Sequence, residues 1–143
     1  MSSTRRKSPG SPIVLIIDDD ADTRRMYGEY LRTKGCTVFV AGDGRSGLDK
    51  ALDLNPDLIV LDLAMPRVDG WTVLKHLRES SWTIDIPVIV LTAVVTVRDE
   101  AFHAGCDAYL TKPCPPEVLW LQTVALLRDR EGLRERAGRG PRV

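Results

Sequence analysis

Residues 57–70 read DLIVLDLAMPRVDG, and this stretch suggests both the fold class and the reactive residue. The four apolar residues 58–61 predict a short strand buried on both faces, because Pro56 precedes them and turn residues follow. Asp62 stands where this strand ends. A carboxylate is costly in an apolar core, but open α/β sheets bind their ligands at the carboxyl ends of strands. We therefore expect Asp62 to be the reactive residue.

Apolar runs and helical spacings alternate along the rest of the chain. The strands are expected at 13–17, 36–40, 58–61, 88–91 and 108–110. The helices are expected at 22–34, around 48–52, around 73–77, at about 97–104 and from Pro115 and Pro116 onward. This alternation predicts a doubly wound (βα)5 α/β fold with a five-stranded parallel sheet. If the two most apolar strands are central neighbours, the strand order is 2-1-3-4-5.

Spacing also predicts the buried faces of two helices and the roles of two turn residues. The inner face of the first helix is expected to carry Met26, Tyr27, Tyr30 and Leu31. That of the last helix is expected to carry Val118, Leu121, Val124 and Ala125. Asp20 is expected to cap the first helix, and Gly70 to complete an Asp-Gly turn before the third.

The length of 143 residues suits one domain, expected at residues 12–128. Residues 1–11 are expected to be a disordered arm, and 129–143 the extended end of the last helix with a disordered basic tail. The arm and the segment 128–143 each carry a net charge of +3, which leaves 11 basic and 17 acidic residues between 13 and 127. An acidic body argues against nucleic-acid binding.

The three cysteines and two histidines exclude several other classes of protein. Three cysteines without a Cys-x-x-Cys spacing argue against a disulfide framework, and two histidines argue against a zinc site. The chain contains neither an apolar run of about 20 residues nor an apolar signal segment. We expect a cytoplasmic protein with no membrane partner.

Polar residues that follow four of the strands are expected to meet at one edge of the sheet. They are Asp18, Asp19, Asp62, Thr92 and Lys112. Three carboxylates about 4 Å apart would repel one another by several kcal/mol, and a hard divalent cation such as Mg²⁺ removes that repulsion. Such a site suits phosphoryl transfer onto an aspartate, with Lys112 and Thr92 binding phosphoryl oxygens. Ala93 is small enough to leave room for the group.

The segments IIDDD, LDLAMPRVDG, VLTA and YLTKP, in this order and spacing, resemble the receiver domain of bacterial two-component response regulators. The resemblance covers residues 13 to about 128 and implies a flavodoxin-like receiver fold similar to the single-domain chemotaxis regulator. It implies that Asp62 accepts a phosphoryl group from a histidine kinase or phosphotransfer protein.

The resemblance also assigns roles to the surrounding residues. Asp18, Asp19, Asp62 and the backbone carbonyl of Ala64 would bind Mg²⁺, or Mn²⁺ in its place. Thr92 and Tyr109 would be the switch residues, Lys112 would pair with the phosphoryl group, and the Lys112–Pro113 bond would be cis. The output would be binding of a partner protein at the face of the fourth helix, fifth strand and fifth helix, without turnover of an external substrate. A homodimer is left open.

Ala64 and Val94 depart from family members that carry polar side chains two residues after the acceptor and after the switch threonine. Because such side chains can orient an attacking water, we expect slow self-hydrolysis of the phosphoryl group here.

Three alternatives remain open. A haloacid-dehalogenase-like phosphatase would also use an aspartate and Mg²⁺, but the required threonine or valine is displaced by one position, at Thr23. A flavodoxin-type cofactor site would be repelled by three aspartates after the first strand. A pseudo-receiver would bind partners without phosphorylation, which the complete set of site residues argues against.

Overall fold

Five strands and five helices alternate along residues 10–138, which is the part of the chain that this computed structural model describes; side chains are described as far as residue 132. The strands are β1 (Ile13–Ile17), β2 (Thr37–Ala41), β3 (Leu58–Leu61), β4 (Val88–Thr92) and β5 (Ala108–Thr111). The helices are α1 (Ala21–Thr33), α2 (Gly44–Leu54), α3 (Gly70–Glu79), α4 (Arg98–Ala104) and α5 (Pro116–Gly138). The predicted elements are all present, with small shifts at their ends; for example, β2 begins at Thr37 and not at Cys36.

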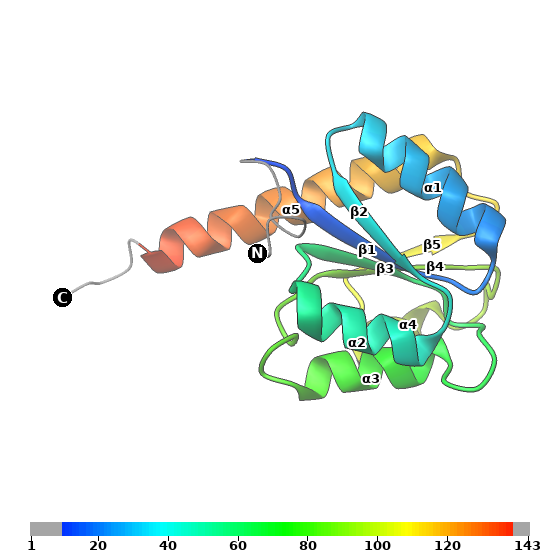
Figure 1. Cartoon of the computed structure of the whole chain (residues 1–143). Coiled ribbons are helices and arrows are strands. Elements are labelled where there is room, and N and C mark those ends of the chain that lie inside the picture. The colour runs from blue at the N-terminus through cyan, green and yellow to red at the C-terminus, as the bar shows by residue number, and fades with distance from the viewer. Residues whose placement is uncertain (1–9, 139–143) are drawn as a thin grey trace.

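The strands form one parallel sheet in the order β2-β1-β3-β4-β5, as expected. Helices α1 and α5 cover one face of the sheet, and α2, α3 and α4 cover the other (Figure 1). Because every strand runs in the same direction, the carboxyl ends of all five lie at one edge. The site residues predicted at the strand ends therefore share that edge.

The core consists of two apolar layers, one on each side of the sheet. Alternate residues of a strand point to opposite faces, so Leu15 and Ile17 pack toward α2 and α3 while Val14 and Ile16 pack toward α1 and α5. Strands β1, β3 and β4 are buried along their whole length. This double burial explains why their sequences are continuous apolar runs rather than alternating patterns.

The buried faces of α1 and α5 differ from the prediction. In α1, Tyr27 and Leu31 are buried as expected, but Met26 is 47% exposed. In α5, Leu119 and Thr123 are buried, whereas Leu121 is 67% exposed. The predicted inner face of α5 is therefore wrong. The error arises because the apolar run at 118–121 is compatible with more than one apolar face of the helix. Val118 is exposed as well.

Thr123 can be buried in α5 because its hydroxyl donates to the carbonyl oxygen of Leu119 at 2.8 Å. The helix then continues past the sheet to Gly138, in agreement with an extended last helix. Arg130 anchors this part by donating to the carbonyl oxygen of Asp57 at 2.8 Å. The predictions of a disordered arm and tail fall mostly on residues 1–9 and 139–143, which lie outside the described residues.

Within the described residues, no helix is both long enough and apolar enough to cross a membrane.

Candidate functional site

Three carboxylates from two neighbouring strands meet at the carboxyl edge of the sheet. Asp18 and Asp19 follow β1, Asp62 follows β3, and one oxygen of each lies within 4.8 Å of the others. Asp18 and Asp62 are 3% and 5% exposed, whereas Asp19 is an exposed residue. The pairing of β1 with β3 puts Ile17 beside Leu61, so the next residues of both strands are adjacent. The parallel register thus creates the acidic cluster.

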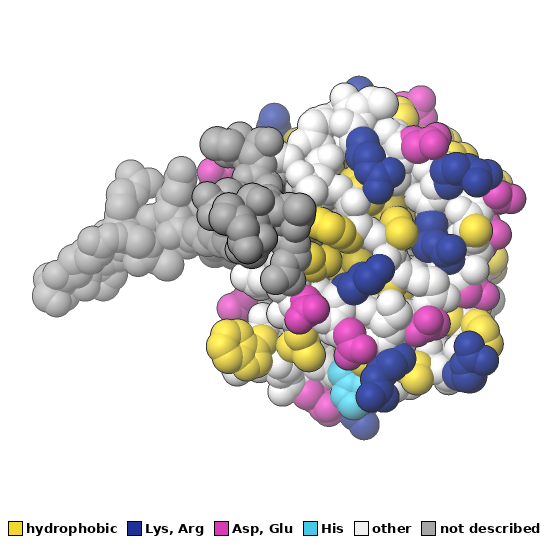
Figure 2. Space-filling view, viewed as in Figure 1, with side chains coloured by type: hydrophobic (Ala, Val, Ile, Leu, Met, Phe, Trp, Pro, Cys, Tyr) yellow, Lys and Arg dark blue, Asp and Glu magenta, His cyan; other side chains and the backbone are white. Residues whose placement is uncertain are grey.

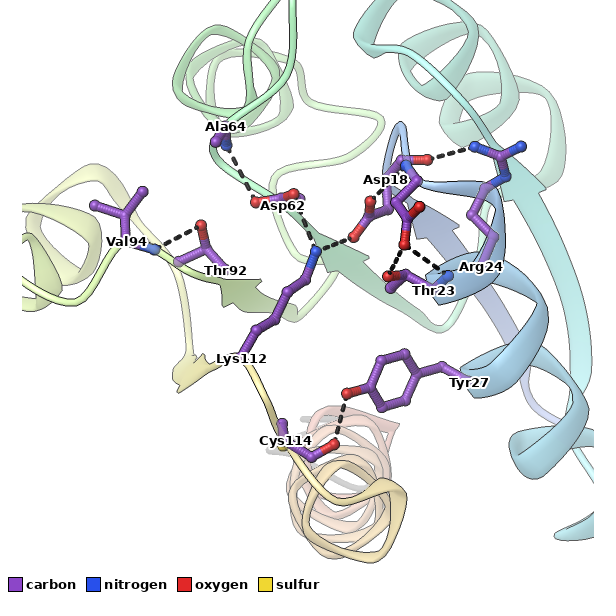
Figure 3. Close-up of polar contacts among 11 residues, drawn as sticks. Asp18, Thr23, Arg24, Tyr27, Asp62, Ala64, Thr92, Val94, Lys112 and Cys114 are labelled. Atoms are coloured by element: carbon purple, nitrogen blue, oxygen red, sulfur yellow. Dashed lines mark hydrogen bonds and ion pairs between the residues drawn. The ribbon is translucent and has the colours of Figure 1, made fainter.

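Lys112, which follows β5, reaches across the sheet edge to the two buried carboxylates. Its Nζ lies 2.8 Å from Oδ2 of Asp18 and 3.2 Å from Oδ2 of Asp62 (Figure 3). Burial lowers the pKa of Lys112, but its hydrogen bond to Asp18 and the charges of both carboxylates outweigh this effect and raise it overall. The lysine is therefore a permanent cation that offsets part of the negative charge of the cluster.

The remaining oxygens of the buried pair accept backbone hydrogen bonds. Oδ1 of Asp18 accepts from the N–H of Asp20 at 2.9 Å, and Oδ1 of Asp62 accepts from the N–H of Ala64 at 3.1 Å. Burial raises the pKa of Asp18, while the Lys112 and Asp20 hydrogen bonds oppose that rise. Both carboxylates are thereby held in one orientation.

The donor set suits a hard divalent cation. Carboxylate and carbonyl oxygens with an exposed side leave space for water ligands, which Mg²⁺ retains in most protein sites. Excess negative charge supports the same assignment, since three carboxylates face a single lysine. The arrangement can hold a cation beside Asp62 and an anionic group between that cation and Lys112.

Thr92 and Tyr109 meet at Val94 rather than at the carboxylates. Thr92 is fully buried, and its Oγ1 accepts from the N–H of Val94 at 3.3 Å. The hydroxyl of Tyr109 donates to the carbonyl oxygen of the same Val94. Both side chains therefore contact the backbone of Val94, in the loop that follows β4. Ala93 in this loop is exposed.

The loop after β5 has the backbone that was expected. The Lys112–Pro113 peptide bond is cis. Next to it, the carbonyl oxygen of Cys114 accepts from the Tyr27 hydroxyl at 2.5 Å, which connects this loop to α1.

Gly70 has a different role from the predicted one. Its φ is not in the left-handed region, and it is the first residue of α3, capped by Asp69. A Cβ at this position would lie 2.1 Å from the carbonyl oxygen of Asp62 and 2.5 Å from Cα of Leu63. Glycine is therefore required at this position, because the backbone of Asp62 and Leu63 approaches it closely. The Asp-Gly pair was visible in the sequence, but the contact was not.

Comparison with known proteins agrees with this geometry. Residues 14–123 match the family model described as the response regulator receiver domain. The receiver domain of a Francisella response regulator superposes with a TM-score of 0.77 at 34% identity, covering 83% of this chain and 98% of that one. The chemotaxis protein CheY4 of Vibrio cholerae superposes with a TM-score of 0.77 at 30% identity, covering 81% and 98%.

The chain belongs to the response regulator receiver family. It is a receiver domain, a signalling module of two-component systems, as the sequence motifs predicted. The phosphatase alternative loses its basis, since the family model and the superposed structures are all receivers.

Curated relatives are longer proteins with transcriptional roles. The chain is 42% identical over 128 residues to the DNA-binding dual master transcriptional regulator RpaA of Synechocystis, covering 88% of this chain and 53% of that protein. It is 42% identical over 122 residues to the transcriptional regulatory protein PrrA of Mycobacterium tuberculosis, covering 84% and 52%. The receiver chain thus spans about half the length of the curated relatives it matches.

Proposed function

We propose that this receiver works by accepting a phosphoryl group on Asp62 from the phosphohistidine of a sensor kinase or phosphotransfer protein. The single observation that carries the proposal is the contact of Lys112 with Asp18 and Asp62 at 2.8 and 3.2 Å beside the exposed Asp19. This cluster places the proposed nucleophile, a cation-binding pair and a positive charge together at one edge of the sheet.

Chemically, an oxygen of the Asp62 carboxylate would form a bond to phosphorus while the phosphorus–nitrogen bond of the phosphohistidine breaks. The bonding electron pair leaves with the imidazole. An ionised carboxylate needs no general base for this step. Lys112 would then pair with an oxygen of the transferred group instead of with Asp62, because the Asp62 oxygen that forms the new bond no longer carries a negative charge.

The proposed ligands of the divalent cation are the carboxylates of Asp18, Asp19 and Asp62 and the backbone carbonyl of Ala64. Mg²⁺, or Mn²⁺ in its place, would neutralise the phosphoryl oxygens during transfer. The chain's own contribution is a rigid donor set, because hydrogen bonds hold the buried carboxylates before any ligand arrives.

The proposed switch passes from Thr92 through Val94 to Tyr109 and changes the face of α4, β5 and α5. Exposed apolar side chains on this face support its use in binding a partner protein; they are Val95, Phe102, Val118 and Leu121. Val95 and Val118 also line a groove of about 400 Å³. It is lined in part by Val95, Arg98, Tyr109, Leu110, Pro113 and Val118. The output partner is proposed to bind here, with no membrane or nucleic-acid contact required of the receiver itself.

Phosphorylation with acetyl phosphate and Mg²⁺, followed by intact-protein mass spectrometry, tests this proposal. We expect one added phosphoryl group on wild type and none on Asp62→Asn. Asp20→Asn is the matched control, because Asp20 is adjacent to the acidic pair and Asn caps a helix about as well as Asp. Chelation of the metal is expected to abolish labelling. Equal labelling of wild type and Asp62→Asn would refute the assignment.

A further inference from the structure

Arg24 contacts the main chain of the acidic cluster without touching its carboxylates. This half-buried residue of α1 donates from Nη1 to the carbonyl oxygen of Asp18 at 2.8 Å (Figure 3). That oxygen belongs to the peptide group that joins Asp18 to Asp19. The guanidinium therefore holds the peptide plane between two of the three acidic residues.

The orientation of this peptide matters most for Asp19. The Asp18 side chain is held by Lys112 and by the N–H of Asp20. The backbone N–H of Asp18 donates to the carbonyl oxygen of Ala41 at 3.0 Å. The Asp19 side chain makes no hydrogen bond or ion pair with any residue in the described part of the chain. Among the described residues no side chain fixes its carboxylate, so the position of that carboxylate depends on the backbone, where Arg24 restrains the preceding peptide.

Gly42, in the loop between β2 and α2, provides the space that the Arg24 guanidinium needs. A Cβ on Gly42 would lie 3.0 Å from Nη1 and 3.4 Å from Cζ of Arg24. The φ of Gly42 is not in the left-handed region, so a side chain here would disturb Arg24 without straining the backbone. The charged end of Arg24 is therefore confined between two loops at the site edge. On the face drawn in Figure 2, Lys and Arg side chains are interspersed with Asp and Glu side chains.

We infer that Arg24 is a positioning residue for cation binding: it holds the Asp18–Asp19 peptide so that the Asp19 carboxylate faces the other two. This inference rests on the proposed function, in which the three carboxylates bind Mg²⁺. Groups that orient metal ligands affect affinity strongly, and their removal commonly weakens binding by about 10- to 100-fold. Because Arg24 restrains the backbone of only one ligand among several, we expect its removal to weaken binding by the lower value, about tenfold.

Arg32 supplies the matched control for Arg24→Ala. It lies on the same helix and likewise donates to a backbone carbonyl, that of Val38, at 3.0 Å, but far from the carboxylates along α1. Arg24→Ala and Arg32→Ala each remove one arginine and one such hydrogen bond. Any general loss of helix packing or stability is therefore common to the two variants.

Titration calorimetry with Mg²⁺ alone, in the absence of any phosphodonor, is the first measurement. We expect Arg24→Ala to weaken Mg²⁺ binding about tenfold and Arg32→Ala to bind as wild type does. We also expect Arg24→Ala to need more Mg²⁺ for half-maximal labelling by acetyl phosphate while reaching a rate at saturating Mg²⁺ within about twofold of wild type. A purely structural role would lower the saturated rate and leave the Mg²⁺ affinity unchanged.

Gly42→Val gives an independent test that keeps the arginine. A valine at position 42 crowds the guanidinium, so Gly42→Val is expected to weaken Mg²⁺ binding. The double variant with Arg24→Ala is expected to be no weaker than Arg24→Ala alone. Mg²⁺ affinity in Arg24→Ala equal to wild type, or an equal loss in Arg32→Ala, would overturn the inference while leaving the proposed function intact. Failure of wild type to bind Mg²⁺ would overturn both.

Discussion

Gly70→Ala is expected to destabilise the protein and to impair phosphorylation, whereas the same substitution at Gly28 is expected to be stabilising. The added methyl group at Gly70 would lie 2.1 Å from the carbonyl oxygen of Asp62 and 2.5 Å from Cα of Leu63. Both atoms are backbone, so no side-chain rotation relieves the overlap. At Gly28, inside α1, the nearest atom would be at 3.5 Å, an ordinary contact.

The size of the destabilisation follows from how far the backbone at Asp62 and Leu63 must move. Restoring van der Waals distance at Gly70 requires a shift of more than about 1 Å, which also disturbs the hydrogen bond from the N–H of Gly70 to the carbonyl oxygen of Leu63 at 3.0 Å. Overpacking of this kind costs about 3 kcal/mol, which corresponds to a fall in Tm of about 10 °C for a domain of this size. Gly28→Ala should instead gain about 0.5–1 kcal/mol from helix propensity.

Urea unfolding curves of the two variants and wild type measure these free energies, and acetyl phosphate labelling measures the effect on Asp62. Gly70→Ala should shift the urea midpoint downward and slow labelling, because the displaced carbonyl belongs to Asp62, the proposed acceptor. A Gly70→Ala variant as stable as wild type would refute the close-approach argument. A loss of more than about 1 kcal/mol in Gly28→Ala would show that helix glycines here are intolerant for some other reason.

Three further predictions concern the thiols, the phosphoryl lifetime and the counter-charge. Burial raises the pKa of Cys36 and of Cys106 to about 11, so the thiols of the folded protein should resist iodoacetamide at pH 8 and react as the pH approaches 11. Rapid alkylation of the folded protein at pH 8 would contradict this. Ala64 and Val94 cannot orient a water, so labelled protein should lose its phosphoryl group slowly in Mg²⁺ and faster in Ala64→Asn; a half-life of seconds in wild type would contradict this. Lys112→Met should lower the unfolding free energy by about 2 kcal/mol without metal, because Asp18 and Asp62 lose their cationic partner. Mg²⁺ should restore much of this loss. Unchanged stability in metal-free buffer would show that Lys112 does not offset the charge of the carboxylates.

The pH dependence of stability from the two thiols has a definite sign. A thiol whose pKa is higher in the folded than in the unfolded protein stabilises the fold below the unfolded pKa. For Cys36 and Cys106 this contribution is complete below pH 9 and is lost as the pH rises from 9 toward 11. The unfolding free energy should therefore fall more between pH 9 and pH 11 in wild type than in a variant with both cysteines replaced by alanine.

The sheet and the acidic cluster were predictable from the sequence because both depend on local pattern. Strands buried on both faces must be continuous apolar runs, and Ile13–Ile17 and Leu58–Leu61 have that form. In a parallel sheet the carboxyl ends of strands lie at one edge, and the pairing of β1 with β3 makes the acids that follow them neighbours. Lys112 joined them for the same topological reason.

Tertiary structure decided those features that the local sequence pattern leaves ambiguous. The run at 118–121 allows several helical stripes, and only packing against the sheet selects Leu119 and exposes Leu121. Arg24 and Gly70 carried no sequence signal for their roles, since one depends on a carbonyl oxygen and the other on the space beside the acceptor loop. Sequence periodicity specifies which residues share a face of an element, while the contacts between loops exist only once the elements are packed together.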